Sequence, residues 1–284
     1  MTSYTCFDVE TRDKIAHIRL KRPEAFNTMN RAFWNELPAI VNGINDEASA
    51  RVIVISSTGK HFSAGMDLSV FTDGQGVASG NTPRNEVGRS RLALRAEALR
   101  LQKTFNCLDE ARMPVLMAVQ GGCVGGAVDM STCADMRYAT KDAFFVIQEI
   151  NLAMTADVGT FPRLCHLLPQ GLVRELAYAG RRLPAQRALE LGFVNELFDT
   201  QEQMLTHVME IAREIASKSP LAVHGSKVMI NYARDHSIAD GLDYIATWQA
   251  GMFNPTSDMF ESFRAKQEKR DPVYEDLFPV RKAM

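Results

Sequence analysis

The first part of the chain, up to about residue 200, switches repeatedly between short apolar runs and amphipathic segments. Residues 7–10 and 14–20 alternate apolar and polar side chains on either side of a polar turn at 11–13, which predicts a β-hairpin. Residues 52–55 and 115–119 are apolar without interruption, and runs this short are typical of buried strands. Strands that alternate with helices in this way predict an α/β fold with a largely parallel sheet.

Between the strands, apolar side chains recur at helical spacing. This spacing predicts helices over residues 31–42, 92–107, 127–134, 163–168, 172–179 and 184–191, and further strands lie at 143–147 and 193–198. Pro38 is expected to weaken or kink the first helix, because proline has no N–H to donate. Residues 72–91 are polar and glycine-rich, and we expect a mobile loop or lid there.

After residue 200 the pattern is helical throughout, which divides the chain into a core at 1–200 and a helical C-terminal region at 201–284. The predicted helices span 201–217, 220–234, 238–251 and 256–270, and an extended tail follows. Trp248, Met252 and Phe253 lack an obvious partner within this region. They pack either against the core or against another subunit, so the region is expected to act as a lid or as an oligomerisation surface.

Composition excludes several classes of protein. The 284 residues have a formal net charge of −2 and no basic block, so nucleic-acid binding has no electrostatic support. No run approaches the roughly 18 apolar residues of a membrane helix. The five cysteines are irregularly spaced and form no CxxC pair, which indicates reduced thiols of a cytoplasmic protein and neither a disulfide framework nor a metal site.

Two glycine turns are the candidate binding elements. Residues 121–126 contain four glycines and lie between the strand 115–119 and a helix. Residues 59–68 contain two more, after the strand 52–55 and before a further expected helix. Glycine lets a ligand approach the backbone, and unpaired N–H groups there can face a carbonyl oxygen that gains charge. The alternatives for the 121–126 run are a phosphate cradle or a simple turn.

Three acids follow the glycine turn at 121–126: Asp129, Glu149 and Asp157. Their neighbours in sequence are mainly apolar, which raises a carboxyl pKa and suits proton transfer near neutral pH. The alternatives are a helix cap for Asp129 or Asp157 and an ordinary strand-end position for Glu149. His61, in the other glycine turn, is a weaker candidate base, because a lone loop histidine is usually only solvated or hydrogen-bonded.

Taken together, the two glycine turns, the three acids and the helical end resemble the crotonase (enoyl-CoA hydratase/isomerase) superfamily over essentially the whole chain. The likeness extends to its dienoyl-CoA isomerases in three places: Gly-Gly-Cys-Val-Gly-Gly-Ala-Val-Asp-Met at 121–130, Asp-Ala-Phe-Phe at 142–145 continuing to Ala-Asp-Val-Gly-Thr at 156–160, and Ser-Pro-Leu-Ala-Val at 219–223 with Ser226, Lys227 and the Arg-Asp-His-Ser at 234–237. The resemblance implies a spiral of ββα turns and a C-terminal helical region that forms a homotrimer or a hexamer of two trimers. It implies an acyl-CoA substrate and no separate cofactor, since coenzyme A is part of the substrate.

The resemblance also assigns roles. The backbone N–H groups of Met66 and Gly126 are the implied oxyanion hole, and Asp129, Glu149 and Asp157 are the implied catalytic acids. Enoyl-CoA hydratases carry Glu, Glu and usually Gly at those three positions, whereas dienoyl-CoA isomerases carry Asp, Glu and Asp, as this chain does. The implied reaction therefore converts a 3,5-dienoyl-CoA to a 2,4-dienoyl-CoA.

Contacts to the CoA part of the substrate follow from the same resemblance. The implied residues are Ala25, Ala64, Gly65, Asp67, Leu68 and, from the last helix, Lys266. An ordinary solvated lysine is the alternative for Lys266.

Three other functions remain as alternatives. An enoyl-CoA hydratase with Asp129 in place of Glu belongs to the same fold, and so does a non-catalytic protein that binds CoA esters or RNA. A dinucleotide-dependent oxidoreductase is disfavoured, because the glycines at 121–126 do not match G-x-G-x-x-G.

Overall fold

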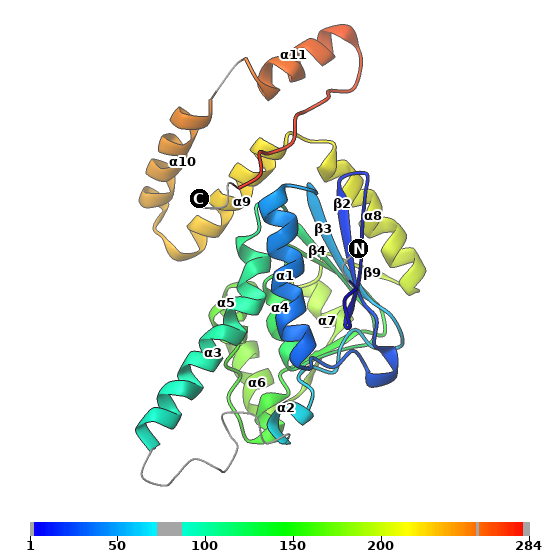
Figure 1. Cartoon of the computed structure of the whole chain (residues 1–284), viewed down its shortest axis with the longest axis vertical. Coiled ribbons are helices and arrows are strands. Elements are labelled where there is room, and N and C mark those ends of the chain that lie inside the picture. The colour runs from blue at the N-terminus through cyan, green and yellow to red at the C-terminus, as the bar shows by residue number, and fades with distance from the viewer. Residues whose placement is uncertain (1–2, 73–86, 254–255, 281–284) are drawn as a thin grey trace.

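The computed structural model describes residues 3–72, 87–253 and 256–280. Its body is a six-stranded sheet with the order β1-β2-β3-β4-β6-β9 (Figure 1). The strands are β1 (Phe7–Arg12), β2 (Ile15–Leu20), β3 (Val52–Ser57), β4 (Val115–Val119), β6 (Met136–Thr140) and β9 (Glu196–Phe198). The hairpin β1/β2 is antiparallel and every other pair is parallel, so the predicted α/β class is confirmed.

A second, three-stranded sheet lies beside the first and has the order β5-β7-β8. Its strands are β5 (Gly122–Val124), β7 (Phe144–Val146) and β8 (Arg182–Pro184), with β5 parallel to β7 and β7 antiparallel to β8. Because β5 lies inside the glycine run 121–126, this small sheet places that run next to the strand that precedes Glu149.

The large sheet is covered on both faces, which explains its uninterrupted apolar strands. Ile53 and Ile55 of β3 join one apolar cluster with α1 (Arg31–Glu47), whereas Val52 and Val54 join another with α8 (Gln201–Ala216). Successive strand side chains point to opposite faces, so both sets need apolar cover. Burial of one such side chain contributes about 1.5–3 kcal/mol.

Helix α1 is longer than predicted and contains Pro38 within it. Proline cannot donate to the carbonyl four residues earlier, which here is the carbonyl of Trp34. The Thr104 hydroxyl, from the neighbouring helix, donates to that Trp34 oxygen at 3.2 Å. The missing hydrogen bond is thereby replaced. The helix also extends beyond its predicted end at residue 42, to Glu47.

The other helices are α2 (Ser69–Thr72), α3 (Val87–Glu110), α4 (Gly126–Thr132), α5 (Thr160–Leu167), α6 (Gln170–Ala179), α7 (Ala185–Glu190), α9 (Pro220–Asp235), α10 (Ile238–Met252) and α11 (Asp258–Glu268), with short 3₁₀ turns η1 (Pro23–Ala25) and η2 (Glu149–Leu152).

The predicted loop at 72–91 is wrong at its end, because α3 already begins at Val87. The first turns of α3 are largely solvent-exposed, so their polar side chains are compatible with a helix. Residues 73–86 of that loop lie outside the described residues. Among the residues described, no helix is long and apolar enough to cross a membrane.

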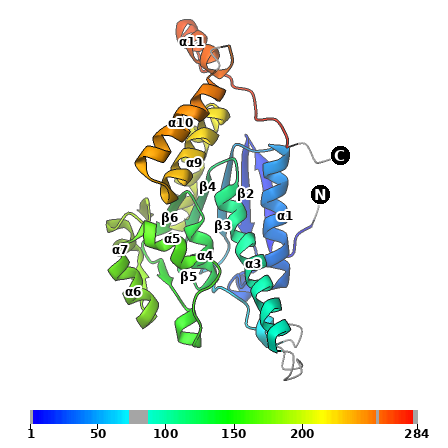
Figure 2. The same ribbon diagram turned by 90° about the vertical axis from the view of Figure 1, so that its left-hand side faces the viewer.

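The helices after residue 200 have different surroundings. Helix α8 packs on the large sheet, and α10 packs on α9. In both views α10 and α11 stand away from the body (Figures 1 and 2). Trp248 of α10 lies against His224 of α9, with ring centroids 5.7 Å apart, while Met252 and Phe253 are exposed. These three side chains therefore do not pack against the core. The division of the chain at residue 200 stays a prediction.

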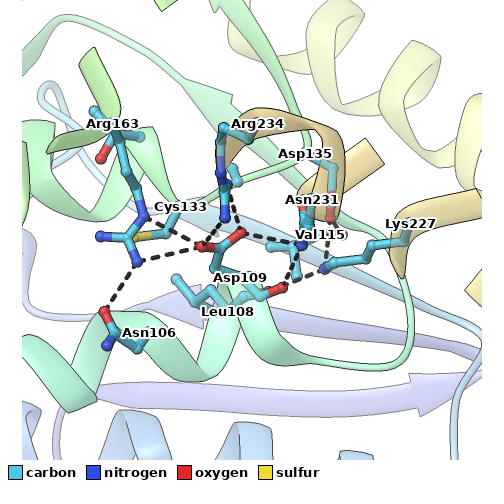
Figure 3. A network of polar contacts seen from close by, with 12 residues as sticks. Asn106, Leu108, Asp109, Val115, Cys133, Asp135, Arg163, Lys227, Asn231 and Arg234 are labelled. Atoms are coloured by element: carbon cyan, nitrogen blue, oxygen red, sulfur yellow. Dashed lines mark hydrogen bonds and ion pairs between the residues drawn. The ribbon is translucent and has the colours of Figure 1, made fainter. Parts of the chain in front are cut away.

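A network of ion pairs joins α9 to the core (Figure 3). The Asp109 carboxylate on α3 accepts hydrogen bonds from Arg234 of α9, at 3.1 Å, and from Arg163 of α5, at 3.3 Å. Lys227 of α9 is buried and donates to Asp135 at 2.8 Å and to the carbonyls of Leu108 and Met113, both at 3.1 Å. Three helices that are distant in sequence are thus held at one place.

Lys227→Met is expected to lower the stability of the fold by about 3 kcal/mol, because it removes the cation beside the Asp135 carboxylate, which keeps the Val115 N–H, and takes the Lys227 donor from two buried carbonyls. Thermal or urea unfolding measures this. The matched control is Lys141→Met, since the Lys141–Asp199 pair is largely exposed; its unfolding midpoint should stay close to that of the wild type. Equal midpoints for the two variants would contradict a structural role for the buried pair.

Candidate functional site

The two predicted glycine turns lie against each other. The N–H of Phe62 donates to the Gln120 carbonyl at 2.8 Å, and Ser63 exchanges backbone hydrogen bonds with Gly122 and Val124, both at 3.1 Å. Nδ1 of His61 accepts the N–H of Gly122 at 2.9 Å. His61, the weaker candidate base, is therefore a structural link between the two turns.

The N–H groups of Met66 and Gly126 are close together and available. A Cβ built on Gly126 would be 4.0 Å from the Met66 nitrogen, and one built on Gly65 would be 3.3 Å from the Gly126 nitrogen. The Met29 N–H donates to the Gly65 carbonyl, and the Met29 carbonyl accepts the Asp67 N–H. In this extended pairing the N–H of Met66, the residue between Gly65 and Asp67, points away from Met29. Within the described part of the chain, no hydrogen bond is recorded from either N–H.

The expected helix after the turn at 59–68 is α2, which begins at Ser69 and is four residues long. Met66 precedes this helix and forms an isolated parallel bridge with Met29. Its N–H is free because of an extended backbone and not because it starts a helix.

Glycine is required at the closest approach of the two turns. Gly65 has φ +82, and a Cβ there would lie 2.5 Å from the Val124 carbonyl oxygen. Gly125 has φ +54, and a Cβ there would lie 3.3 Å from Oε1 of Glu149. The left-handed backbone and the lack of space both exclude larger residues. The Glu149 carboxyl thus lies directly beside the glycine run.

Asp129 is buried on α4, with 1% of its surface exposed. Its Oδ1 accepts two hydrogen bonds from Thr160, one from the N–H and one from the hydroxyl, each 2.7 Å long. Its Oδ2 is buried without a partner. Burial raises the pKa of Asp129 to about 6, against the opposing effect of the Thr160 hydrogen bonds. The cap alternative is partly right, since this carboxylate binds the first N–H of α5.

Glu149 begins η2, directly after β7. Its Oε2 is buried and has no hydrogen-bond partner. Burial raises the pKa of Glu149 to about 7, and the negative charge of Asp129 adds to the effect. Glu149 is therefore not an ordinary surface residue at a strand end, and it can be protonated near neutral pH.

Asp157 differs from the other two acids, because its side chain is exposed. The expectation of apolar surroundings is wrong for this residue, which lies in the segment before α5 with solvent on one side. It does not cap α5 either, whose N-cap is Gly159. Its charge nevertheless contributes to the raised pKa of both Asp129 and Glu149. The structure thus brings all three predicted acids together: Asp129 is buried, Glu149 is partly buried and Asp157 is open to water.

Glu149→Gln is expected to stabilise the protein at pH 8 by roughly 2 kcal/mol and to leave its stability at pH 4 nearly unchanged. The folded-state pKa is raised from 4.5 to about 7, so the stability that neutral Glu149 contributes is fully present below about pH 4.5 and is lost as the pH rises through 7. Melting temperatures between pH 4 and 8 measure the difference. Glu190→Gln, at an exposed ion pair with Arg187, is the control. The same pH-dependent change of melting temperature in both variants would contradict the raised pKa of Glu149.

The predicted CoA-contact residues are placed as follows. Ala25 lies in η1, and the Ala64 N–H donates to the neighbouring Phe26 carbonyl at 3.0 Å, so these two loops are adjacent. Leu68 and Lys266 are exposed, but α11, which carries Lys266, stands apart from the body (Figure 1). One chain therefore does not bring Lys266 to the other predicted residues.

Asp67 has a structural task. Its Oδ2 accepts the Thr28 hydroxyl at 2.9 Å, and its Oδ1 accepts the N–H and hydroxyl of Ser69. These hydrogen bonds, those from Ser69 first, lower the pKa of Asp67. The carboxylate thereby ties the turn that contains Met66 to the turn after the first hairpin.

Sequence reasoning missed three polar residues that hold the site. Asn27 donates to the Thr58 carbonyl at 2.8 Å, and the Ser63 hydroxyl donates to the Asn27 carbonyl at 2.8 Å and accepts the Gly65 N–H at 3.1 Å. The third is Thr160. The helix predicted here began only at residue 163, whereas α5 begins at Thr160, and no sequence signal pairs Thr160 with Asp129. Among the residues described, no group of three or more His, Cys, Asp or Glu side chains is arranged so that it could hold a metal ion.

The chain is similar to several named proteins and to solved structures. The chain is 40% identical over 271 residues to the mitochondrial Delta(3,5)-Delta(2,4)-dienoyl-CoA isomerase of Mus musculus. The matched region covers 95% of this chain and 81% of the mouse protein. It is 34% identical to the peroxisomal Delta(3,5)-Delta(2,4)-dienoyl-CoA isomerase of Arabidopsis thaliana, over 98% of this chain and 99% of the plant protein. A crystal structure of enoyl-CoA hydratase from Bacillus anthracis matches with a TM-score of 0.81 at 28% identity, over 98% of this chain and 100% of that one.

These names correct one prediction. The expectation of a cytoplasmic protein is wrong, because the two similar isomerases are named as mitochondrial and peroxisomal. The expectation was based on unpaired cysteines, four of which are buried here and one exposed. Unpaired cysteines argue only against an oxidising compartment and do not discriminate among the others.

The family itself is shown by a match over most of the chain. The model of the enoyl-CoA hydratase/isomerase family matches residues 10–277, which include both glycine turns and all three acids. The chain belongs to the enoyl-CoA hydratase/isomerase family.

Proposed function

We propose that this protein is a dienoyl-CoA isomerase that converts a 3,5-dienoyl-CoA to a 2,4-dienoyl-CoA. The observation that carries the proposal is the trio of acids, Asp129, Glu149 and Asp157, which come from three different segments and influence one another's charge. The names of the similar mouse and plant proteins support the same reaction. The reaction needs no cofactor beyond the coenzyme A that the substrate carries.

The proposed reaction moves one proton from C2 to C6. Ionised Asp157 removes the C2 proton, and the electron pair moves onto the thioester oxygen to give a dienolate. The N–H groups of Met66 and Gly126 hold this oxygen, and each such donor contributes roughly 3–4 kcal/mol to lowering the barrier. Protonated Glu149 then delivers a proton to C6, which restores the carbonyl.

The two acids need opposite protonation states at the start, and their surroundings support this difference. Glu149 is partly buried beside the Asp129 charge, which favours its neutral form. Asp157, in contrast, is exposed to water. Solvent access at Asp157 also gives a route for its captured proton to leave, which the next turnover requires.

We also propose that the protein is a homotrimer or a hexamer of two trimers, assembled through the helical C-terminal region. Helices α10 and α11 expose large apolar side chains, among them Ile238, Leu242, Phe260 and Phe263. Large exposed apolar side chains of this kind are typical of subunit contacts. Sedimentation equilibrium of the full chain tests the assembly, and a monomer at micromolar concentration would overturn it.

The test of the activity is a panel of 3,5-dienoyl-CoA esters monitored by ultraviolet absorbance, with crotonyl-CoA as the control. Isomerisation brings the diene into conjugation with the thioester, so the absorbance at long wavelength should rise. Rapid loss of crotonyl-CoA absorbance without any diene signal would instead identify an enoyl-CoA hydratase. CoA-ester binding without either reaction would identify a non-catalytic member of the fold.

A further inference from the structure

Thr160 makes the only hydrogen bonds recorded within the described residues to the carboxylate of Asp129. Both its N–H and its hydroxyl donate to Oδ1, each at 2.7 Å, and both residues are buried. The second oxygen, Oδ2, is left buried without a partner. A carboxylate fixed by one oxygen has little freedom to turn, so Thr160 decides which oxygen remains available.

We propose that Thr160 is a positioning residue for the isomerisation, which holds Asp129 as an oriented anion so that Glu149 stays protonated. This inference rests on the proposed function. Both Thr160 contacts are donors, and donors to a carboxylate favour its ionised form. Thr160 is also the first residue of α5, and a helix N-terminus favours a nearby negative charge.

The hydrogen-bonded contact between Thr160 and Asp129 is rigid, because α5 is anchored independently of Asp129. Arg163, one turn further along α5, donates to Asp109 at 3.3 Å and to Asn106 at 2.9 Å, both on α3 (Figure 3). The same guanidinium lies against Gly159, where a Cβ would be 2.7 Å from it. The start of α5, and with it the Thr160 hydroxyl, is therefore held in place before Asp129 contributes.

Other titratable groups face Asp129 from the elements around it. Glu149 comes from η2, Asp157 from the segment before α5, Cys123 from β5 and Cys133 from the end of α4. Burial raises the pKa of the Cys133 thiol to about 12 and also raises that of Cys123, so neither thiol is charged near neutral pH. The carboxyls alone then determine how this cluster titrates between pH 5 and 9.

The test compares Thr160→Val with Thr160→Ser and with Thr132→Val. Valine keeps the shape and the backbone N–H but removes the hydroxyl, which weakens the hold on the Asp129 anion. Serine restores the hydroxyl. Thr132 is the matched control, because its buried hydroxyl donates to the same residue at 2.7 Å, but to the Asp129 backbone carbonyl.

In Thr160→Val, Asp129 should take up a proton at higher pH, and Glu149 should lose its proton at lower pH. The alkaline limb of kcat against pH is expected to move down by about one unit, which lowers kcat on that side about tenfold, while KM changes by less than about twofold. Thr160→Ser and Thr132→Val should keep the wild-type limb. An unshifted limb in Thr160→Val, with or without a uniform loss of rate, would overturn the inference.

A second measurement separates this inference from the proposed function. Infrared difference spectra of the substrate-free protein follow the carboxyl band of Asp129, identified by its loss in Asp129→Asn, as the pH is changed. The midpoint should rise in Thr160→Val and stay in place in Thr132→Val. If the wild type isomerises no dienoyl-CoA, the proposed function fails, and an unshifted carboxyl midpoint independently shows that Thr160 does not act on Asp129.

Discussion

Glu149→Gln and Asp157→Asn are each expected to lower the turnover of a 3,5-dienoyl-CoA by on the order of 10² to 10⁴. The amide in Glu149→Gln would keep the size of the side chain but could not deliver a proton to C6, and the amide in Asp157→Asn could not accept one from C2. Binding of the CoA ester should be nearly intact in both variants, because neither change touches the N–H groups of Met66 and Gly126. Stopped-flow absorbance gives turnover, and titration calorimetry gives binding.

The control for both variants is Glu190→Gln, which neutralises an exposed acid on α7. Its turnover should be that of the wild type. Near-normal turnover in both Glu149→Gln and Asp157→Asn would remove these residues from the reaction. Loss of turnover in only one of them would leave that residue as the single proton-transfer acid and would favour a different reaction of the same fold.

Gly65→Ala is expected to lower kcat by on the order of 10² to 10³ through displacement of the Met66 N–H. The new methyl group would lie 2.5 Å from the Val124 carbonyl oxygen, and φ at this residue is +82. The loop at 59–68 must therefore move relative to the glycine run, and the two N–H groups of the oxyanion hole separate. KM should change far less than kcat, because these donors act mainly on the charged dienolate.

Gly192→Ala separates this effect from backbone strain alone. Gly192 has a similar φ of +77, but no atom lies within 4 Å of the Cβ position. Both variants should lose some thermal stability, since alanine is disfavoured at positive φ. Only Gly65→Ala should lose turnover. Equal turnover in the two variants would show that the Met66 N–H does not contribute to the reaction.

Much of the fold follows from local patterns in the sequence. The uninterrupted apolar run at 52–55 predicted a strand, and β3 is that strand. Its alternate side chains join two different apolar clusters. Helix α1 shows where such reasoning stops. Pro38 marks a weak point in the sequence, but a hydroxyl from α3 supplies the hydrogen bond that the proline cannot make. That compensation comes from a residue 70 positions away from Trp34.

The candidate site shows the same division. The glycine turns and the three acids could be selected from residue type and spacing alone, because close backbone approach requires glycine and proton transfer requires a titratable group. The different surroundings of the acids could not be selected in this way. Asp129 and Glu149 each keep a buried oxygen without a partner, whereas Asp157 is exposed. All three have mainly apolar neighbours in sequence, so burial depends on what packs there in three dimensions.

The sequence by itself determined which segments form strands and helices, where the backbone can approach a ligand, and which side chains can exchange protons. These properties depend on side chains and their near neighbours along the chain. Only the tertiary structure decided that Thr160 clamps Asp129, that His61 joins two loops instead of acting as a base, and that Asp157 remains in contact with water. Burial, hydrogen bonding and charge proximity set these roles, and all three depend on residues far apart in sequence that folding brings together.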